Sequence, residues 1–207
     1  MFALVDKSDN LITRMLNGNK GITIGDNQYP RAIFSLWTEA ERNAINIYTV
    51  TIDETNRKDE KWYINTNITY AFDGTNATGS YGTATAKRHA DTTWTQEQID
   101  DGDAPDGADT DTVAGEGLKT VLIKQIKSQA EGILNKTDWY ITRKTEKNTA
   151  IPSAITTHRD AVRSKQDSMC TAITNASDTP ALETLYTFTK QDDGSVTRPL
   201  GELPILE

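Results

Sequence analysis

The chain has 207 residues, of which 36% are apolar and 25% are charged, and its formal net charge is −8. This length suits one large domain or two small ones, and the apolar fraction is low but sufficient for folding. A general nucleic-acid-binding protein needs a surplus of Lys and Arg, so the acidic balance argues against that class.

The first part of the chain contains short, alternating apolar runs. Residues 2–5 and 11–16 are separated by five polar residues, a pattern that predicts a β-hairpin. Residues 47–53 and 61–72 alternate between apolar and polar side chains, so we expect them to be strands. Together these patterns predict a β-rich domain over residues 1–91.

A compact group of apolar residues precedes a short helix in this domain. We call the group the apolar knot, and it comprises Ile33, Phe34, Leu36 and Trp37. Thr38 follows with Glu41 three residues later, so a capping box is expected to start a helix here. The Gly- and Thr-rich stretch over residues 73–86 is expected to be the end of a hairpin or an irregular loop.

An acidic stretch occupies residues 92–115. Asp101, Asp103 and Asp106 are weak candidates for a calcium site, because with the glycine after them they are similar in spacing to an EF-hand loop. The third aspartate lies one residue too late, a proline intrudes, and no Glu closes the loop. The stretch is therefore expected to be a solvated linker without a metal, with bound calcium as the alternative.

Helical spacing dominates residues 116–190. Apolar residues recur on one side of a helix of about five turns that starts near Leu118, with lysines on the other side. Pro152 suits the first turn of a second helix, which is expected to continue to about Asn175. Ser177 or Asp178 is then expected to cap a third, short helix.

The last residues, 191–207, contain two prolines and an apolar end. They predict an extended tail that docks on another surface. Taken together, the patterns predict an α+β fold, in which a β-rich domain of hairpins and a short helix is followed by an acidic linker and a C-terminal helical hairpin unit.

Asp138 and Trp139 lie between the two long predicted helices, and His158 and Arg159 follow in the second helix. A catalytic arrangement is one interpretation of these residues. We favour a structural one, in which Asp138 caps a turn and Trp139 packs with Ile141 to seal the helical pair.

No sequence motif for catalysis or cofactor binding is present. The chain has no P-loop, no nucleotide-binding GxGxxG, no GxSxG and no HExxH. One cysteine, Cys170, excludes an internal disulfide, and two histidines are too few for a His-rich metal site. No stretch has the roughly 18 apolar residues of a membrane helix, and the N-terminus is unlike a signal peptide. We expect a soluble protein, made in a cytoplasm, that is not an enzyme.

Residues 137–165, which read TDWYITRKTEKNTAIPSAITTHRDAVRSK, carry a resemblance to a known family. Tail fibre assembly proteins and tail assembly chaperones of tailed bacteriophages often end in a similar unit. In that unit a helix leads to an Asp-Trp pair, a polar loop with a proline, and a helix with a Tyr-Arg…Leu-Arg pattern. The matching positions here are Asp138-Trp139, Pro152, His158-Arg159 and Val162-Arg163. His158 replaces the usual Tyr, and the loop before Pro152 is longer and more polar.

A second segment, residues 22–50, is similar to the front of related proteins from phages of marine bacteria. The resemblance implies a virion structural protein of the phage tail, associated with the tail fibre or baseplate, that is made in the host cytoplasm. It implies protein–protein binding and no enzymatic activity. The alternatives are a tail fibre assembly chaperone that leaves before the virion is mature, and a module at the fibre tip that binds host surface glycans.

Partner contacts are expected at the apolar knot and at the apolar end of the tail. The expected partner-binding residues are Ile33, Phe34, Leu36, Trp37, Trp62, Leu203, Ile205 and Leu206, and the expected structural residues are Asp138, Trp139, Pro152 and Arg159. Exposed aromatic residues such as Trp62 would also serve the glycan-binding alternative. A homo-oligomer is compatible with this assignment, although the sequence has no coiled-coil heptads.

Overall fold

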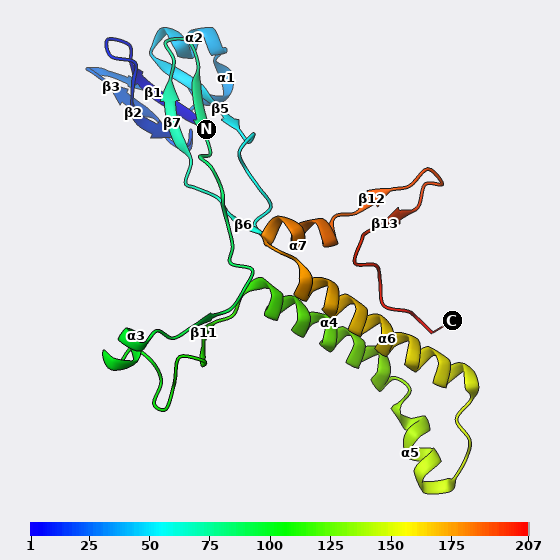
Figure 1. Cartoon of the computed structure of the whole chain (residues 1–207). Helices are drawn as coiled ribbons and strands as arrows, with labels where there is room; N and C mark the ends of the chain where they lie inside the picture. The colour runs from blue at the N-terminus through cyan, green and yellow to red at the C-terminus, as the bar shows by residue number, and fades with distance from the viewer. Residues whose placement is uncertain (207) are drawn as a thin grey trace. The chain divides into compact units, whose positions relative to one another are not determined.

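A computed structural model describes residues 1–206 of the chain. The chain forms two compact units, one of Met1–Thr85 and one that starts at Ala86 (Figure 1). The first unit is β-rich and contains two short helices, and the second contains the four longest helices. The prediction of an α+β fold with a β-rich N-terminal part and a helical C-terminal part is therefore confirmed.

A five-stranded sheet forms the centre of the first unit. In spatial order its strands are β2 (Leu11–Leu16), β1 (Phe2–Asp6), β5 (Ile47–Asp53), β8 (Ala77–Ser80) and β7 (Thr69–Phe72). The β5–β8 pair is parallel, and the other pairs are antiparallel. The pairing of β1 with β2 confirms the predicted hairpin, whose turn contains Asn10 at a positive φ of 58°.

The inner strand β1 sends side chains to both faces of the sheet, and both sets of side chains pack in apolar clusters. Ala3 and Val5 pack in one cluster with Tyr48 and Phe72. Phe2 and Leu4 pack on the other face in a cluster whose buried members are Ile22, Ile33 and Ile47. Because successive strand residues point to opposite faces, a run of apolar residues is expected where both faces are buried.

Small elements cover the second of these faces. They are the hairpin of β3 (Ile22–Ile24) and β4 (Asn27–Tyr29) and the helices α1 (Ile33–Leu36) and α2 (Glu39–Ala44). The helix α2 begins with the predicted capping box, since the backbone N–H of Glu41 donates to Thr38 Oγ1 and the backbone N–H of Thr38 donates to Glu41 Oε2. This prediction is confirmed.

The strand predicted over residues 61–72 is interrupted. A short strand β6 (Tyr63–Ile64) pairs with β9 (Thr85–Ala86), and β7 begins only at Thr69. Between them the side chain of Asn65 bonds both the N–H and the C=O of Lys58, at 2.9 and 2.8 Å. Such bonds from a side chain to the backbone compete with a strand ladder, which explains the break.

The strand β8 lies in the Gly- and Thr-rich stretch, which the sequence did not identify as a strand. A Cβ atom at Gly79 would lie 2.7 Å from Tyr70 Cε1 and 2.9 Å from Ile52 Cδ1. Both neighbours are the direct cross-strand partners of Gly79. Glycine therefore makes room here for two large side chains, although glycine usually indicates a loop.

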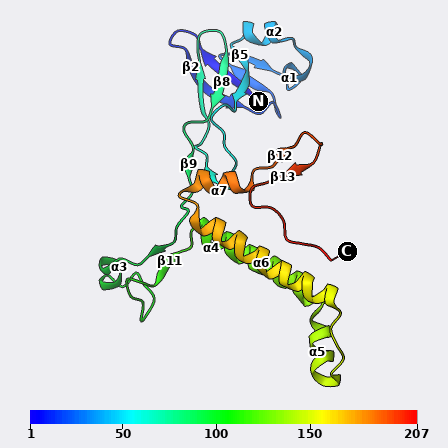
Figure 2. The same cartoon turned by 45° about the vertical axis from the view of Figure 1, so that its right-hand side comes forward.

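Two long antiparallel helices form the centre of the second unit. They are α4 (Leu118–Asn135) and α6 (Ser153–Asn175), which pack side by side (Figures 1 and 2). Their buried apolar residues are Leu122, Ile126 and Ala130 on α4 and Ile155, Val162, Met169 and Ile173 on α6. The predicted helical hairpin is confirmed, including the end of its second helix at Asn175.

Shorter elements complete the second unit. They are β10 (Thr92–Thr93), α3 (Gln96–Asp100), β11 (Val113–Gly115), α5 (Asp138–Lys147), α7 (Thr179–Tyr186), β12 (Thr189–Lys190) and β13 (Val196–Thr197). The acidic stretch thus contains a paired strand and a capped helix rather than linker alone. The predicted cap of α7 is Asp178, which accepts a hydrogen bond from the N–H of Ala181 at 2.8 Å.

The C-terminal residues dock in part on their own unit. The N–H of Leu200, a buried residue, donates to the C=O of Leu185 in α7 at 3.0 Å. The guanidinium of Arg198 lies over the rings of Tyr186 and Phe188. The strand β13, which lies inside the predicted extended tail, pairs with β12 just before it, so the tail is not extended throughout. Among the described helices, none combines the length and apolar character that a membrane span requires.

The start of α4 is fixed by Asp91. Its carboxylate accepts hydrogen bonds from the N–H of Gly117 at 2.7 Å and from the hydroxyl of Thr120 at 2.8 Å. These bonds, that of Gly117 foremost, lower the pKa of Asp91 below its usual value of 3.8. The chain approaches itself so closely here that a Cβ atom at Gly117 would lie 2.3 Å from the backbone of Ala90.

We expect two glycines of this region to respond in opposite ways to alanine. Gly117→Ala should destabilise the second unit by about 1–3 kcal/mol, because backbone must move to admit the methyl group. Gly132→Ala, inside α4 with open space around its Cβ position, should stabilise it by about 0.5–1 kcal/mol. Urea denaturation followed by far-UV circular dichroism measures both. A Gly117→Ala protein at least as stable as the wild type would contradict the close approach.

Asp91 makes stability depend on pH. The folded state lowers its pKa, so its contribution is present above pH 3.8 and is lost as the pH falls through the lower, folded-state value. We expect Asp91→Asn to melt at a lower temperature than the wild type at pH 6, and the difference to shrink below pH 3.8. Thermal melts at a series of pH values test this. A difference that does not change with pH would show that the charge of Asp91 is unimportant.

Candidate partner-binding surfaces

A buried arginine ties three segments of the second unit together. Arg159 lies on α6 and is 7% exposed. Its Nη1 atom donates to the C=O of Leu134 at 2.8 Å and to Thr137 Oγ1 at 2.6 Å, and its Nη2 atom lies 2.8 Å from Asp138 Oδ1. One guanidinium therefore contacts the end of α4, the connecting residues and the start of α5. We call these four residues the Arg159 cluster.

The Arg159 cluster explains where α4 ends and α5 begins. The last carbonyls of a helix lack partners within the helix, and a cation near them is favourable. Arg159 supplies both a donor and a charge at that place. Asp138 neutralises the buried guanidinium, and its carboxylate sits in the first turn of α5, where negative charge is favourable. The expectation that Asp138 caps a turn is wrong, since no side-chain hydrogen bond caps α5, and the Asp138 carboxylate pairs with Arg159 instead.

The helix α5 has no buried residue and exposes aromatic and apolar side chains. Trp139 is 51% exposed, and Ile141 is also exposed. The prediction that these two residues seal the helical pair is therefore wrong. Residues two apart do not share a helix face, and α5 leads away from the α4–α6 pair beyond the end of α4 (Figure 2).

The exposed Trp139 is held in a stack. Its ring lies against that of Tyr140, with ring centroids 3.7 Å apart, and the guanidinium of Arg143 is 4.8 Å from the centroid of the Trp139 ring. The same guanidinium is 5.3 Å from the Tyr140 ring. Cation–π contacts of this kind keep an exposed aromatic ring in one orientation. The ring is thus presented to solvent with little freedom left to lose on binding.

The surface of α5 is also cationic. Arg143, Lys144 and Lys147 lie on it, against a single further carboxylate, Glu146, since the charge of Asp138 is engaged by Arg159. Interface centres are enriched in Trp, Tyr and Arg, which are the residues that meet here. We call Trp139, Tyr140 and Arg143 the α5 surface, and it is a candidate contact surface.

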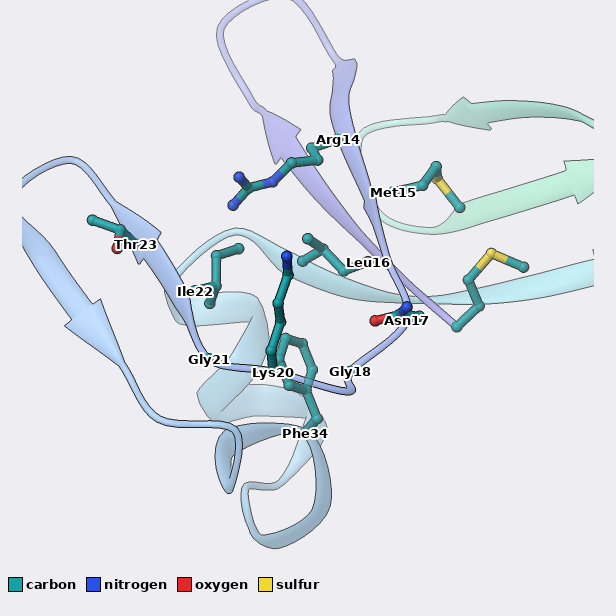
Figure 3. A pocket seen from close by; sticks show the side chains of 11 residues that line it. Arg14, Met15, Leu16, Asn17, Gly18, Lys20, Gly21, Ile22, Thr23 and Phe34 are labelled. Carbon is teal, nitrogen blue, oxygen red and sulfur yellow. The ribbon is translucent and has the colours of Figure 1, made fainter.

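A second candidate lies in the first unit. A hollow of about 620 Å³ opens beside β2 and β3 (Figure 3). Leu16, Ile22 and Phe34 form its apolar wall. The guanidinium of Arg14 and the ammonium of Lys20 point into the same space in Figure 3. An apolar hollow with cations at its mouth can hold an apolar group attached to an acidic one.

The residues predicted to bind partners are distributed between core and surface. Ile33 is fully buried and packs within the first unit, and Trp62 is 3% exposed, so neither side chain is available as a surface contact. Phe34 lines the hollow, and Trp37 is half-buried with its ring edge-on to Tyr29. Leu36 is 78% exposed. In the tail, Leu203 is half-buried, whereas Ile205 and Leu206 are exposed.

The remaining predicted residues lie apart from one another. Over residues 1–206, no group of three or more His, Cys, Asp or Glu side chains is placed to hold a metal, so Asp101, Asp103 and Asp106 do not converge. Pro152 precedes α6 and is exposed. Burial raises the pKa of the free thiol of Cys170, which makes it a poor nucleophile.

Comparison with known proteins gives no match: no family model, curated protein or solved structure is significantly similar to this chain. The resemblance of residues 137–165 to phage tail proteins therefore depends on the sequence positions given above.

The Arg159 cluster predicts a contrast between two arginines one turn apart on α6. Arg159→Met should destabilise the second unit by about 1–3 kcal/mol, because it removes the donor to the Thr137 hydroxyl oxygen and the cation paired with Asp138. Arg163, half-exposed and paired with Asp160 at 3.2 Å, is the matched control. Arg163→Met should change stability by less than about 0.5 kcal/mol. Equal effects of the two substitutions in urea denaturation would contradict the role assigned to Arg159.

Proposed function

We propose that this chain is a tail or tail-fibre-associated protein of a tailed bacteriophage, which acts by binding other proteins. The observation that carries the proposal is the Arg159 cluster with the exposed α5 surface. Asp138, Trp139 and Arg159 are among the residues on which the family resemblance depends. In the structure, Arg159 Nη2 lies 2.8 Å from Asp138 Oδ1, and the next residue, Trp139, is exposed.

This arrangement supports a binding role for the resembling segment. An ion pair between the buried Arg159 and the half-exposed Asp138 fixes the base of a short helix. This helix exposes a Trp that is stacked with a half-buried Tyr and a half-buried Arg. A rigid aromatic anchor loses little conformational entropy on binding, so it suits a protein–protein contact. The proposal assigns no catalytic step and no cofactor to the chain.

Permanent and transient partners remain two forms of the same proposal. A virion component stays on the tail fibre or baseplate, whereas an assembly chaperone binds the fibre protein and leaves. The glycan-binding alternative relied on Trp62 as an exposed stacking platform, and the burial of that side chain weakens it. We therefore put forward the protein-binding assignment.

Mass spectrometry of purified, washed particles tests the assignment. We expect the chain in particles in a fixed ratio to the fibre or baseplate proteins. Abundance in infected-cell lysate with absence from particles would instead indicate a chaperone that departs. Absence from both particles and fibre-protein complexes would contradict the proposal.

A matched pair of variants tests the α5 surface in the same experiment. Trp139→Ala should reduce the amount of the chain in particles, or bound to fibre protein, at least about tenfold, which is the size of effect expected for an aromatic anchor. Val121→Ala, an exposed apolar residue on α4, should have no effect. Equal incorporation of the two variants would exclude α5 as the main contact.

A further inference from the structure

The hollow of the first unit continues into a groove. A second hollow, of about 420 Å³, shares Asn17, Gly18 and Phe34 with the first and is also lined by Phe2 and Arg31. We call the two hollows together the groove. Arg14 and Lys20 line its first hollow, Arg31 lines its second, and Phe34 lines both. Two neighbouring hollows of this size offer more space than one small ion or one side chain needs, so the groove suits an extended segment of chain.

The groove is cationic in an acidic protein. Its lining contains three charged residues, Arg14, Lys20 and Arg31, and no carboxylate. Within residues 1–206, none of these three cations forms an ion pair. All three side chains are exposed at the mouth of the groove. The chain as a whole carries a net charge of −8, so the positive charge of the groove is opposite in sign to the net charge of the chain.

The wall of the groove is apolar and well supported. Leu16 and Phe34 pack on the buried cluster of Ile22, Ile33 and Ile47. The ring of Phe34 also lies against that of Phe2, with centroids 5.0 Å apart. A wall fixed in this way can bury a large apolar side chain of a ligand without rearranging.

We propose that this groove binds an extended acidic segment of a partner protein. One large apolar side chain of that segment enters the hollow between Leu16, Ile22 and Phe34. Carboxylates on either side of it pair with Arg14 and Lys20 at one end and with Arg31 at the other. Charge complementarity selects this occupant, because a basic segment would be repelled by all three cations. The inference rests on the proposed function only in taking the ligand to be a protein.

A titration with a labelled peptide tests the groove on the full chain. The probe is a fluorescein-labelled heptapeptide with two Glu residues on each side of a central Ser-Phe-Ser. Fluorescence anisotropy should show saturable binding that weakens as salt is raised. Replacing the central Phe by Ser, or every Glu by Lys, should weaken binding at least about tenfold. These substitutions are made in the peptide and not in the protein, so a loss of binding cannot be due to misfolding of the protein.

Charge reversal on the protein provides the matched control. Arg14→Glu combined with Lys20→Glu should weaken binding of the probe at least about tenfold. Lys7→Glu makes the same kind of change at an exposed lysine of the same unit that does not line the groove, and it should have little effect. No binding of the probe, or equal binding by the two variants, would overturn the inference. The wild-type chain could also form a dimer that is lost in the Arg14→Glu, Lys20→Glu variant. That result would identify a second copy of the chain as the occupant of the groove and would overturn the inference.

The outcomes separate this inference from the proposed function. If the peptide does not bind but the chain is present in particles, the groove inference is rejected and the tail assignment stands. Binding of the peptide with the chain absent from particles and fibre complexes would keep the groove and reject the tail assignment.

Discussion

The hydrogen bonds and the ion pair of the buried Arg159 guanidinium hold α4, α5 and α6 of the second unit together. The guanidinium closes the end of α4, holds Thr137 in the connecting turn and pairs with Asp138 at the start of α5. A buried charge without partners is very unfavourable, so these contacts have to form together. The position of α5, and with it the presentation of Trp139, follows from a residue that itself lies on α6.

Both candidate surfaces combine apolar and cationic groups in a chain that is acidic overall. The α5 surface places Arg143 against Trp139 and Tyr140, and the groove of the first unit places Arg14 and Lys20 beside Phe34. A negative net charge favours solubility and discourages non-specific association. In our proposal, local cationic patches with an apolar centre select acidic partners, and other parts of the surface provide solubility.

Local signals allowed much of the fold to be predicted from the sequence. The β1–β2 hairpin, the capping box at Thr38 and the lengths of α4 and α6 follow from alternation, capping and helical spacing. The strand β8 was missed because the need for a glycine at position 79 arises from the Tyr70 and Ile52 side chains on neighbouring strands. The sequence alone does not place these side chains beside Gly79. The groove was missed for a similar reason, since Arg14, Lys20 and Phe34 come together only through packing. Trp139 was misplaced because large aromatic side chains are usually buried, whereas α5 leaves the α4–α6 pair.

Hydrogen–deuterium exchange of the chain, alone and bound to its fibre or baseplate partner, tests the central claim most directly. The claim is that α5 is a contact helix held in place by Arg159. It predicts that binding slows exchange of the amides of residues 138–147, which have no buried side chain in the free chain. Unchanged exchange over these residues in a complex that is otherwise protected would contradict it.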